Sequence, residues 1–325
     1  MTQTPHETNQ VTEFANQVIA EVERAIVGKT DLLIKILSAF LASGHILLED
    51  FPGLGKTILS KSLATALGLD FKRIQFTPDL LPGDITGSYL FNREKSRFEL
   101  RKGPVFANII LADEINRASP KTQSALLEAM QELQVTLEGE TMRLEEPFIV
   151  IATQNPIEYE GTFPLPEAQL DRFMIKLPVG YPTLPEEIVI LQQRRKRKSD
   201  EVNITQVADK KRVLALRRII ETIFVDPDLE GYIVQLVHET RQDKRIAVGA
   251  SPRGSLALLK LARAYAAIKG RTFVLPDDIK VFVLPALSHR LILEPEYWMK
   301  PQAVDEILTE IIRSTPVPVI TGLPR

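Results

Sequence analysis

The chain has 325 residues, more than one average domain, and its 44% hydrophobic and 25% charged residues are ordinary for a globular protein. Its 40 basic and 42 acidic residues nearly cancel, so no overall field attracts it to nucleic acid or to an anionic membrane. The lack of cysteine excludes disulfides, a thiolate nucleophile and cysteine-ligated metal.

The chain begins with a polar stretch, Met1 to Gln10, that has none of the features of a targeting segment. No apolar stretch in the sequence reaches the length that spans a bilayer. We therefore expect a cytoplasmic protein without membrane insertion. Hydrophobic periodicity changes character near Gly180-Tyr181-Pro182, which predicts one domain over residues 1–181 and a second over residues 182–325.

The first of these domains alternates short apolar runs with helical patterns. Three runs bounded by turn residues are predicted to be strands: His45–Leu48, Ile109–Ala112 and Phe148–Ala152. Continuous apolar runs of this kind suit a parallel sheet that is buried on both faces, with helices as crossovers between the strands. The fold class predicted for residues 1–181 is therefore α/β.

A glycine-rich segment, Gly53-Leu54-Gly55-Lys56-Thr57, follows the first predicted strand and opens a helical pattern that runs to about Gly68. Glycines let backbone N–H groups converge on phosphate, and a helix N-terminus adds partial positive charge. The segment predicts a P-loop, although Asp50 stands where that pattern has its first glycine; a turn with a chance lysine is the alternative. The predicted nucleotide-binding residues here are Pro52, Gly53, Leu54, Gly55, Lys56, Thr57 and Ile58.

Two acids, Asp113 and Glu114, follow the second predicted strand. In a P-loop enzyme Lys56 neutralises the β- and γ-phosphates of ATP, Thr57 gives its hydroxyl to Mg²⁺, and an acid on a neighbouring strand also holds the metal. We expect Asp113 to hold Mg²⁺ and Glu114 to polarise the attacking water. Adjacent acids at a strand end also occur as solvated termini, which is the alternative.

An amide, Asn155, follows the third predicted strand and precedes Pro156. Proline favours extended geometry for the residue before it, which would hold this amide at the rim where strand ends gather. A polar amide at that rim can order water and detect the γ-phosphate. An ordinary turn is the alternative reading of Asn before Pro.

The second half of the chain shows apolar residues at helical spacing, with starts beside proline and one stop at Gly270. These features predict a small all-helical domain. The expected helices cover Val207–Phe224, Asp228–Glu239, Pro252–Ile268, Asp277–Leu287 and Pro301–Ile312. A basic run, Arg194–Lys198, is expected to be the solvated end of a helix. Binding of nucleic acid by this run is the less favoured alternative.

The order of these motifs resembles the MoxR family of AAA+ ATPases, in the helix-2-insert group, from about Val11 to Pro318. The segments that carry the resemblance are the P-loop, Leu111–Ala118, Ala152–Pro156, Leu165–Phe173 and Ser251–Gly254. The resemblance implies an AAA+ core with a helical lid, ATP and Mg²⁺ as cofactors, and a ring that is usually hexameric. It also implies chaperone-like maturation of client proteins, often ones with von Willebrand factor A domains.

The same resemblance implies roles for single residues. Asn155 corresponds to a sensor of the γ-phosphate, Arg172 to an arginine finger that reaches a neighbouring subunit, and Arg253 to the sensor arginine of the lid. Arg117 is the rival for the finger. The segment Val27-Gly28-Lys29 is similar to the one that wraps the adenine. Each arginine could instead form a surface ion pair, the commoner fate of an arginine.

Two hairpins are predicted at the positions of the family's insertions. Ser88–Phe91 pairs with Arg97–Leu100, and Val135–Leu137 pairs with Met142–Leu144 across Gly139. In a ring they would face the pore or the top, where they could grip a substrate; packing hairpins without such a role are the alternative. Two other functions on the same core stay open. One is a nucleic-acid motor, for which the only basic surface in the sequence is Arg194–Lys198, and the other is the motor subunit of a metal chelatase.

Overall fold

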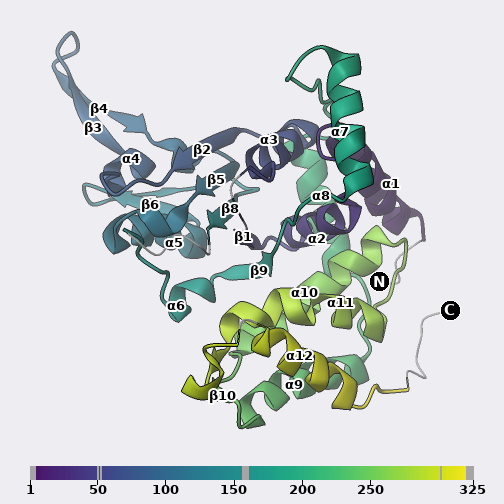
Figure 1. Ribbon diagram of the computed structural model, residues 1–325. Coiled ribbons are helices and arrows are strands. Elements are labelled where there is room, and N and C mark those ends of the chain that lie inside the picture. Colours follow the sequence, from purple (N-terminus) through teal and green to yellow (C-terminus); the bar gives the residue numbers. More distant parts are fainter. Residues whose placement is uncertain (1–4, 50, 52, 156–160, 301, 320–325) are drawn as a thin grey trace.

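The computed structural model describes residues 5–49, 51, 53–155, 161–300 and 302–319 (Figure 1). A five-stranded sheet with the order β2-β5-β8-β1-β9 lies at the centre of its first part, and all neighbouring strands are parallel. The strands are β1 (His45–Glu49), β2 (Phe71–Gln75), β5 (Ile109–Asp113), β8 (Ile149–Gln154) and β9 (Phe173–Leu177).

The three strands predicted from sequence are the three inner strands of this sheet, β1, β5 and β8, so that prediction is confirmed. The two edge strands were not predicted. In β2 only Ile74 is buried, because this strand has a neighbour on one side alone and carries polar residues. The apolar run that marks a strand covered on both faces is therefore missing from it.

Alternate residues of each inner strand enter two different cores. In β5, Ile109 and Leu111 pack with helices α1, α2 and α3, whereas Ile110 and Ala112 pack with α4 and α5 on the other face. This period of two follows from the pleat of a strand. The helices of this part are α1 (Pro5–Glu23), α2 (Thr30–Leu41), α3 (Lys56–Leu67), α4 (Pro82–Thr86), α5 (Pro120–Glu132) and α6 (Glu167–Leu170).

Both predicted hairpins are present, with bounds that differ by a residue or two. One pairs β3 (Gly87–Asn92) with β4 (Arg97–Lys102), and the other pairs β6 (Gln134–Leu137) with β7 (Glu140–Arg143). The first projects from the body of the protein (Figure 1). The second turns at Glu138 and Gly139, whose φ angles of 48° and 86° lie in the left-handed region that a two-residue hairpin turn requires.

The second part of the chain is helical, as expected, with one addition: a short antiparallel pair joins β10 to β11. Two 3₁₀ turns flank the second of these strands, η3 (Ser288–Arg290) and η4 (Pro295–Tyr297). The remaining elements are α7 (Leu184–Arg197), α8 (Lys210–Glu221), α9 (Pro227–Gln242), β10 (Ile246–Val248), α10 (Pro252–Ile268), α11 (Pro276–Leu287), β11 (Ile292–Leu293) and α12 (Ala303–Ser314).

The helix predicted over Val207–Phe224 is shorter at both ends than its sequence pattern. Val207 lies before the helix and donates its N–H to Ala66 O at 2.7 Å. Helix α8 begins only after Asp209, whose carboxylate caps the helix by accepting from Arg212 N. At the other end Phe224 forms a β-bridge with Phe273. Tertiary contacts therefore override the periodicity at each end. The predicted start of the last helix, Pro301, lies outside the described residues.

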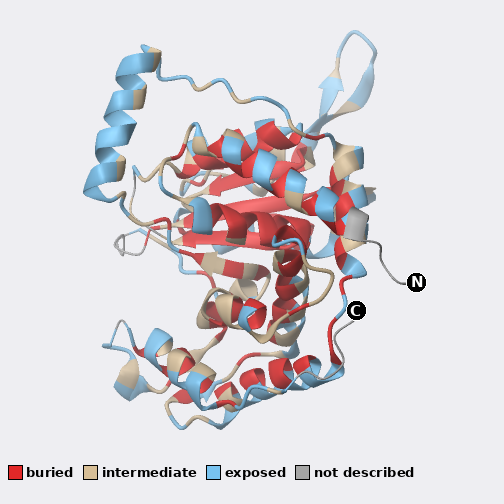
Figure 2. Ribbon diagram, turned by 90° about the vertical axis from the view of Figure 1, so that its right-hand side faces the viewer, coloured by how far each residue is buried: buried red, intermediate tan, exposed pale blue. Residues whose placement is uncertain are grey.

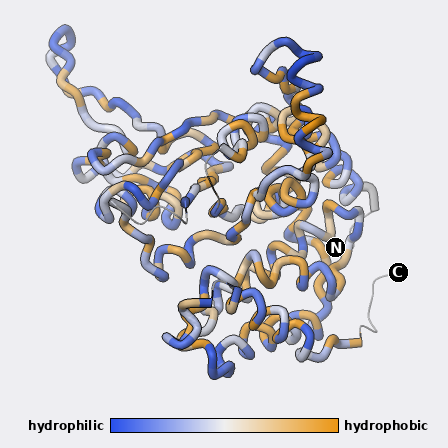
Figure 3. The backbone as a smooth tube through the Cα atoms, viewed as in Figure 1, coloured by the Kyte–Doolittle hydropathy of each residue, from blue (hydrophilic) through white to orange (hydrophobic). Residues whose placement is uncertain are grey.

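Of the lid helices, α10 and α11 lie beside edge strand β9, and α9 and α12 pack on them, away from α3 (Figure 1). Their buried residues join those of α1 and α2 in one continuous core, which Figure 2 shows in red. Helix α7 stands apart, with no buried residue, and its last turn carries the basic run that was expected to solvate a helix end. Figure 3 shows this far end of α7 as hydrophilic. No helix of the described segments has the length and apolar character of a membrane crossing.

Candidate functional site

The glycine-rich segment connects the carboxyl end of β1 to the first turn of α3. Gly53 and Gly55 have φ angles of 84° and 79°, which a side chain would strain, and Lys56 is the first helical residue. The N–H groups of this first turn have no partner within the helix and point out of its N-terminus. A helix N-terminus preceded by such a loop suits an anion, and it lies where the sequence predicted the P-loop. Asp50 and Pro52 lie outside the described residues.

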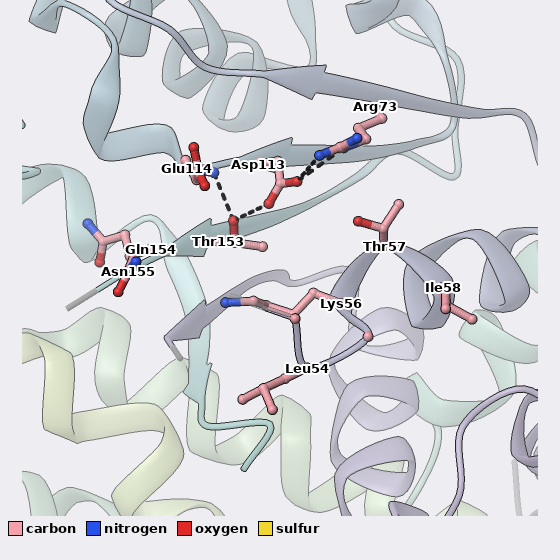
Figure 4. Close-up of a pocket in the computed structure, with 12 residues that line it drawn as sticks. Leu54, Lys56, Thr57, Ile58, Arg73, Asp113, Glu114, Thr153, Gln154 and Asn155 are labelled. Atoms are coloured by element: carbon pink, nitrogen blue, oxygen red, sulfur yellow. Dashed lines mark hydrogen bonds and ion pairs between the residues drawn. The ribbon is translucent and has the colours of Figure 1, made fainter. Parts of the chain in front are cut away.

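The two acids stand at the carboxyl end of β5, beside the loop (Figure 4). Glu114 has φ 56° and ψ 50°, a left-handed conformation that costs free energy for a residue with a side chain. Its N–H is held by Thr153 Oγ1 at 2.8 Å, and this hydroxyl in turn donates to Asp113 Oδ1 at 2.7 Å. Thr153 is buried in β8, so it fixes both acids against the neighbouring strand.

Two side chains that contact the acids at this edge were missed from the sequence: Arg73 and Gln75 of strand β2. Arg73 donates to Asp113 Oδ2 from Nη2 at 2.6 Å and from Nε at 3.1 Å, and Gln75 donates to Glu114 Oε2 at 2.7 Å. The two residues alternate with Ile74, so they share one face of the strand. That alternation was the available signal, but it points to the acids only once β2 is known to pair with β5.

One cavity of about 360 Å³ collects most of the predicted catalytic groups. Asn155, which is buried, enters it from the end of β8, and Arg73 enters it from β2. Lys56 extends across the cavity in Figure 4, and the hydroxyl of Thr57 faces the side on which Asp113 stands. Its lining residues are Gly53, Leu54, Gly55, Lys56, Thr57, Ile58, Arg73, Asp113, Glu114, Thr153, Gln154 and Asn155.

Arg117 also lies at this carboxyl edge, and its Nη1 forms an ion pair with Glu114 Oε2 at 3.0 Å within the same chain. Arg172 and Arg253 lie elsewhere. They line a second cavity, of about 240 Å³, together with Lys260. Arg172 directly precedes Phe173, the first residue of β9, which pairs with the first residue of β1. These two arginines are therefore at the amino edge of the sheet, opposite the phosphate loop.

A buried ion pair connects this amino edge to the lid. Arg290 donates from Nε to Asp171 Oδ1 at 2.7 Å and from Nη2 to Phe173 O at 2.8 Å, and its side chain is 3% exposed. Burial lowers the pKa of Arg290, and the charge of Asp171 opposes that shift. Ser251 donates to Asp171 Oδ2 at 3.1 Å, and Arg253 Nε lies 3.9 Å from the same oxygen. The carboxylate beside Arg172 thus holds three lid residues.

The segment Val27-Gly28-Lys29 lies near the phosphate loop but does not line the same cavity. Its neighbour Ile26 would stand 3.2 Å from a Cβ added to Gly55. Gly28 and Lys29 line a separate cavity of about 510 Å³ with Glu186 of helix α7. A Cβ on Gly28 would collide with the Glu186 carboxylate, and Lys29 Nζ donates to Tyr181 O at 3.1 Å. This segment is therefore tied to the start of α7.

Comparison with known proteins agrees with this geometry. Residues 45–175 match the model of an ATPase family associated with various cellular activities (AAA), and residues 238–311 match the AAA lid domain. The chain is 40% identical over 318 residues to Chaperone MoxR1 of Mycobacterium tuberculosis, which covers 95% of this chain and 84% of that protein. The chain belongs to the MoxR family of AAA+ ATPases.

Two further matches cover nearly the whole chain. Uncharacterized protein YeaC of Bacillus subtilis is 50% identical over 93% of this chain and 94% of its own length. The crystal structure of a putative ATPase from Cytophaga hutchinsonii is 40% identical, has a TM-score of 0.90, and covers 97% of this chain and 98% of that one. This MoxR-family chain therefore has an AAA+ domain with a parallel sheet, followed by a C-terminal lid domain.

Proposed function

We propose that this MoxR-family protein hydrolyses ATP with Mg²⁺ in a ring of identical subunits and uses the free energy to remodel partner proteins. One observation carries the proposal: the predicted catalytic groups are divided between two edges of one sheet. Lys56, Glu114 and Asn155 line a cavity at the carboxyl edge, whereas Arg172 and Arg253 line one at the amino edge. A complete site therefore needs groups from two chains.

The size of the sheet supports this division. Strand β9 begins directly after Arg172 and contains five residues, Phe173–Leu177. At about 3.3 Å per residue the two edges are about 15 Å apart, which is beyond the reach of an arginine side chain. In this proposal Arg172 and Arg253 reach only a nucleotide bound to a neighbour. A head-to-tail contact of this kind closes into a ring, and we take the hexamer of the family as its size.

At the carboxyl edge each side chain has a distinct role. The first turn of α3 and Lys56 hold the phosphates, Glu114 accepts a proton from the attacking water, and Asn155 orients that water. Thr57 and Asp113 supply the oxygen ligands that Mg²⁺ prefers. Among the described residues no group of three or more His, Cys, Asp or Glu could hold a metal ion, so phosphates and water would complete the coordination. When bound, Mg²⁺ would offset charge that develops on the γ-phosphate.

Residues 1–181 are taken as the nucleotide-binding core, and residues 182–325 as the lid. The hairpin β3–β4 exposes Phe91 and Phe98, at 53% and 68%, which offers apolar contacts to a client. The name of the relative Chaperone MoxR1 supports a chaperone-like role. Clients with von Willebrand factor A domains are the class that we expect.

Mixing two inactive variants tests the shared site. Lys56→Ala should lose ATP binding but keep its finger, and Arg172→Ala should bind ATP but lack the finger. In a mixed ring, some interfaces join an Arg172→Ala subunit to a Lys56→Ala subunit. The site at such an interface has the working phosphate loop of the first subunit and the working finger of the second. We expect ATPase activity to return when the two preparations exchange subunits, as measured by phosphate release.

Arg117→Ala is the matched control, because Arg117 lies beside Glu114 of its own chain. Each site in a ring of Lys56→Ala and Arg117→Ala subunits carries one of the two defects, so no activity should return. Subunit exchange is verified by light scattering and by mass labels. Exchange without recovery for Arg172→Ala would refute the finger in trans, and recovery with Arg117→Ala would move the finger there.

A further inference from the structure

The two carboxylate oxygens of Asp113 have different partners. Oδ1 accepts the hydroxyl of Thr153 at 2.7 Å, and the same hydroxyl oxygen accepts Glu114 N–H at 2.8 Å. Thr153 is 1% exposed and lies on a central strand, so this bond is fixed by the sheet. Oδ2 is the other oxygen, and its partner is Arg73 (Figure 4).

The partner of Oδ2 is much less confined than that of Oδ1. Arg73 belongs to edge strand β2, and its side chain is 47% exposed, against 14% for Asp113. Its guanidinium lies in the same cavity as Thr57 and the phosphate loop. A half-exposed arginine can leave a carboxylate at small cost, because water replaces the lost contacts. One oxygen of Asp113 therefore has a fixed partner, and the other has a partner that can be exchanged.

Arg73 occupies the carboxylate oxygen of Asp113 that Mg²⁺ would approach. Thr57 and Asp113 are the oxygen donors of the proposed Mg²⁺ site, and Oδ1 of Asp113 is already occupied by Thr153. A divalent cation, or a water that it polarises, would therefore approach Oδ2. Two cations repel each other at one carboxylate oxygen, and a water bound to Mg²⁺ needs the same lone pairs as the guanidinium.

We propose that Arg73 and Mg²⁺ exchange at Oδ2 of Asp113. This inference rests on the proposed Mg²⁺-dependent binding of ATP. Arg73 neutralises the carboxylate while no nucleotide is bound, and it leaves Oδ2 when Mg²⁺ arrives with ATP. The freed guanidinium remains within the cavity that holds the phosphates. Arg73 consequently determines how much free Mg²⁺ the protein needs in order to bind ATP.

The test measures binding, without turnover. A fluorescent ATP analogue at fixed concentration is titrated with free Mg²⁺ against the wild type and Arg73→Gln. Removing the competing cation should lower the Mg²⁺ concentration for half-maximal binding by about two- to fivefold, the range of a partly exposed ion pair. Arg218→Gln, an exposed arginine of α8, is the matched control and should leave the midpoint unchanged. An unchanged or raised midpoint in Arg73→Gln overturns the inference.

The same titration in the Asp113→Asn variant separates exchange at Oδ2 from a general effect of the charge of Arg73. In Asp113→Asn the carboxylate is gone, so Arg73 no longer competes there, but its charge still repels cations across the cavity. We expect the shift caused by Arg73→Gln to disappear in that background. The same shift in both backgrounds would attribute it to long-range repulsion and refute exchange at Oδ2.

The failure of this inference is distinguishable from failure of the proposed function. A wild type that binds no Mg²⁺–ATP contradicts both. A wild type with normal Mg²⁺-dependent binding, and Arg73 variants with the same midpoint, contradicts the exchange alone. If Arg73→Gln fails to fold, as judged by thermal melting, Arg73→Lys replaces it. Lysine keeps the charge but cannot donate two bonds, so a smaller shift in the same direction is expected.

Discussion

The two edges of the central sheet are built in different ways. At the carboxyl edge, Asp113 ends β5, Asn155 directly follows β8, and Lys56 begins the helix after β1. The parallel sheet brings the three residues into one cavity. At the amino edge, Arg172 precedes a strand, and its neighbours Arg253 and Arg290 arrive from lid segments far along the chain. Each of these three groups of the first edge belongs to a short local pattern, whereas the second edge is assembled from segments far apart in the chain.

This difference has a functional meaning in the proposed ring. The carboxyl edge holds acids and a phosphate loop, which act on the nucleotide of their own chain. The amino edge gathers the cations Arg172, Arg253 and Lys260 around a small cavity, which suits the phosphates of another chain. Variants at the two edges should therefore behave differently when subunits are mixed.

The largest expected effect is at the carboxyl edge. Glu114→Gln should bind ATP normally and lower kcat by about 10²- to 10⁴-fold, because an amide keeps the shape but accepts a proton poorly. Single-turnover hydrolysis and equilibrium ATP binding measure the two properties separately. The variant should also retain clients in a pull-down, because it stays in the ATP state. Unchanged turnover would assign the base to another group.

A smaller effect is expected at the amino edge, in Arg253. Loss of one charge-assisted contact to phosphate in Arg253→Ala should lower kcat by about 10- to 100-fold. Because Arg253 lies with Arg172, this variant should regain activity when mixed with Lys56→Ala. Arg263→Ala, on the same helix but paired with Glu221, is the control and should keep wild-type activity. A lack of complementation would instead indicate that Arg253 acts on the nucleotide of its own chain.

The junction of the amino edge with the lid can be broken through Arg290. Arg290→Met leaves Asp171 without its buried partner and should lower the free energy of unfolding by about 3 kcal/mol. Urea denaturation measures the loss. The double variant with Asp171→Asn should lose less than the sum of the two single changes, because the ion pair is then absent as a unit. Strict additivity would show that the pair contributes nothing to the junction.

The smallest expected effect is a pH dependence from His45, also at the amino edge. Burial lowers its pKa from 6.5 to about 4, and the charge of Arg217 adds to the shift. His45 Nδ1 accepts Val150 N–H at 3.0 Å, and Nε2 lies 3.0 Å from Met130 O, so a proton on Nδ1 would meet another donor. The neutral form is therefore the folded form. Its contribution is complete above pH 6.5 and is lost as the pH falls toward 4.

Between pH 7 and pH 5 this histidine should reduce the free energy of unfolding by about 2 kcal/mol. Urea denaturation at the two pH values measures the change. His45→Gln should show less of it, because an amide can accept from Val150 and donate to Met130 at either pH. His289, whose pKa burial also lowers, contributes in the same direction and remains in the variant. An equal pH dependence in the variant would exclude His45 as its source.

The sequence alone predicted the inner strands and the carboxyl edge, because each depends on a short contiguous pattern. An apolar run predicts a strand covered on both faces, and the polar residue after it must lie at the edge where parallel strands end. Asp113 and Asn155 follow from this rule, and Lys56 follows from the glycine-rich segment after β1. Edge strand β2 does not, since a strand with one neighbour needs few apolar residues, and Arg73 was missed with it.

The sequence by itself determined the α/β core, the helical second part and the family, since these depend on periodicity and motif order. Tertiary structure alone decided three matters: that Arg73 sits on Asp113, that Arg253 lies away from the phosphate loop of its own chain, and that a buried ion pair joins Asp171 to the lid. Each concerns the relative position of residues far apart in sequence. Their distance is set by strand order and helix packing, and no local pattern records either.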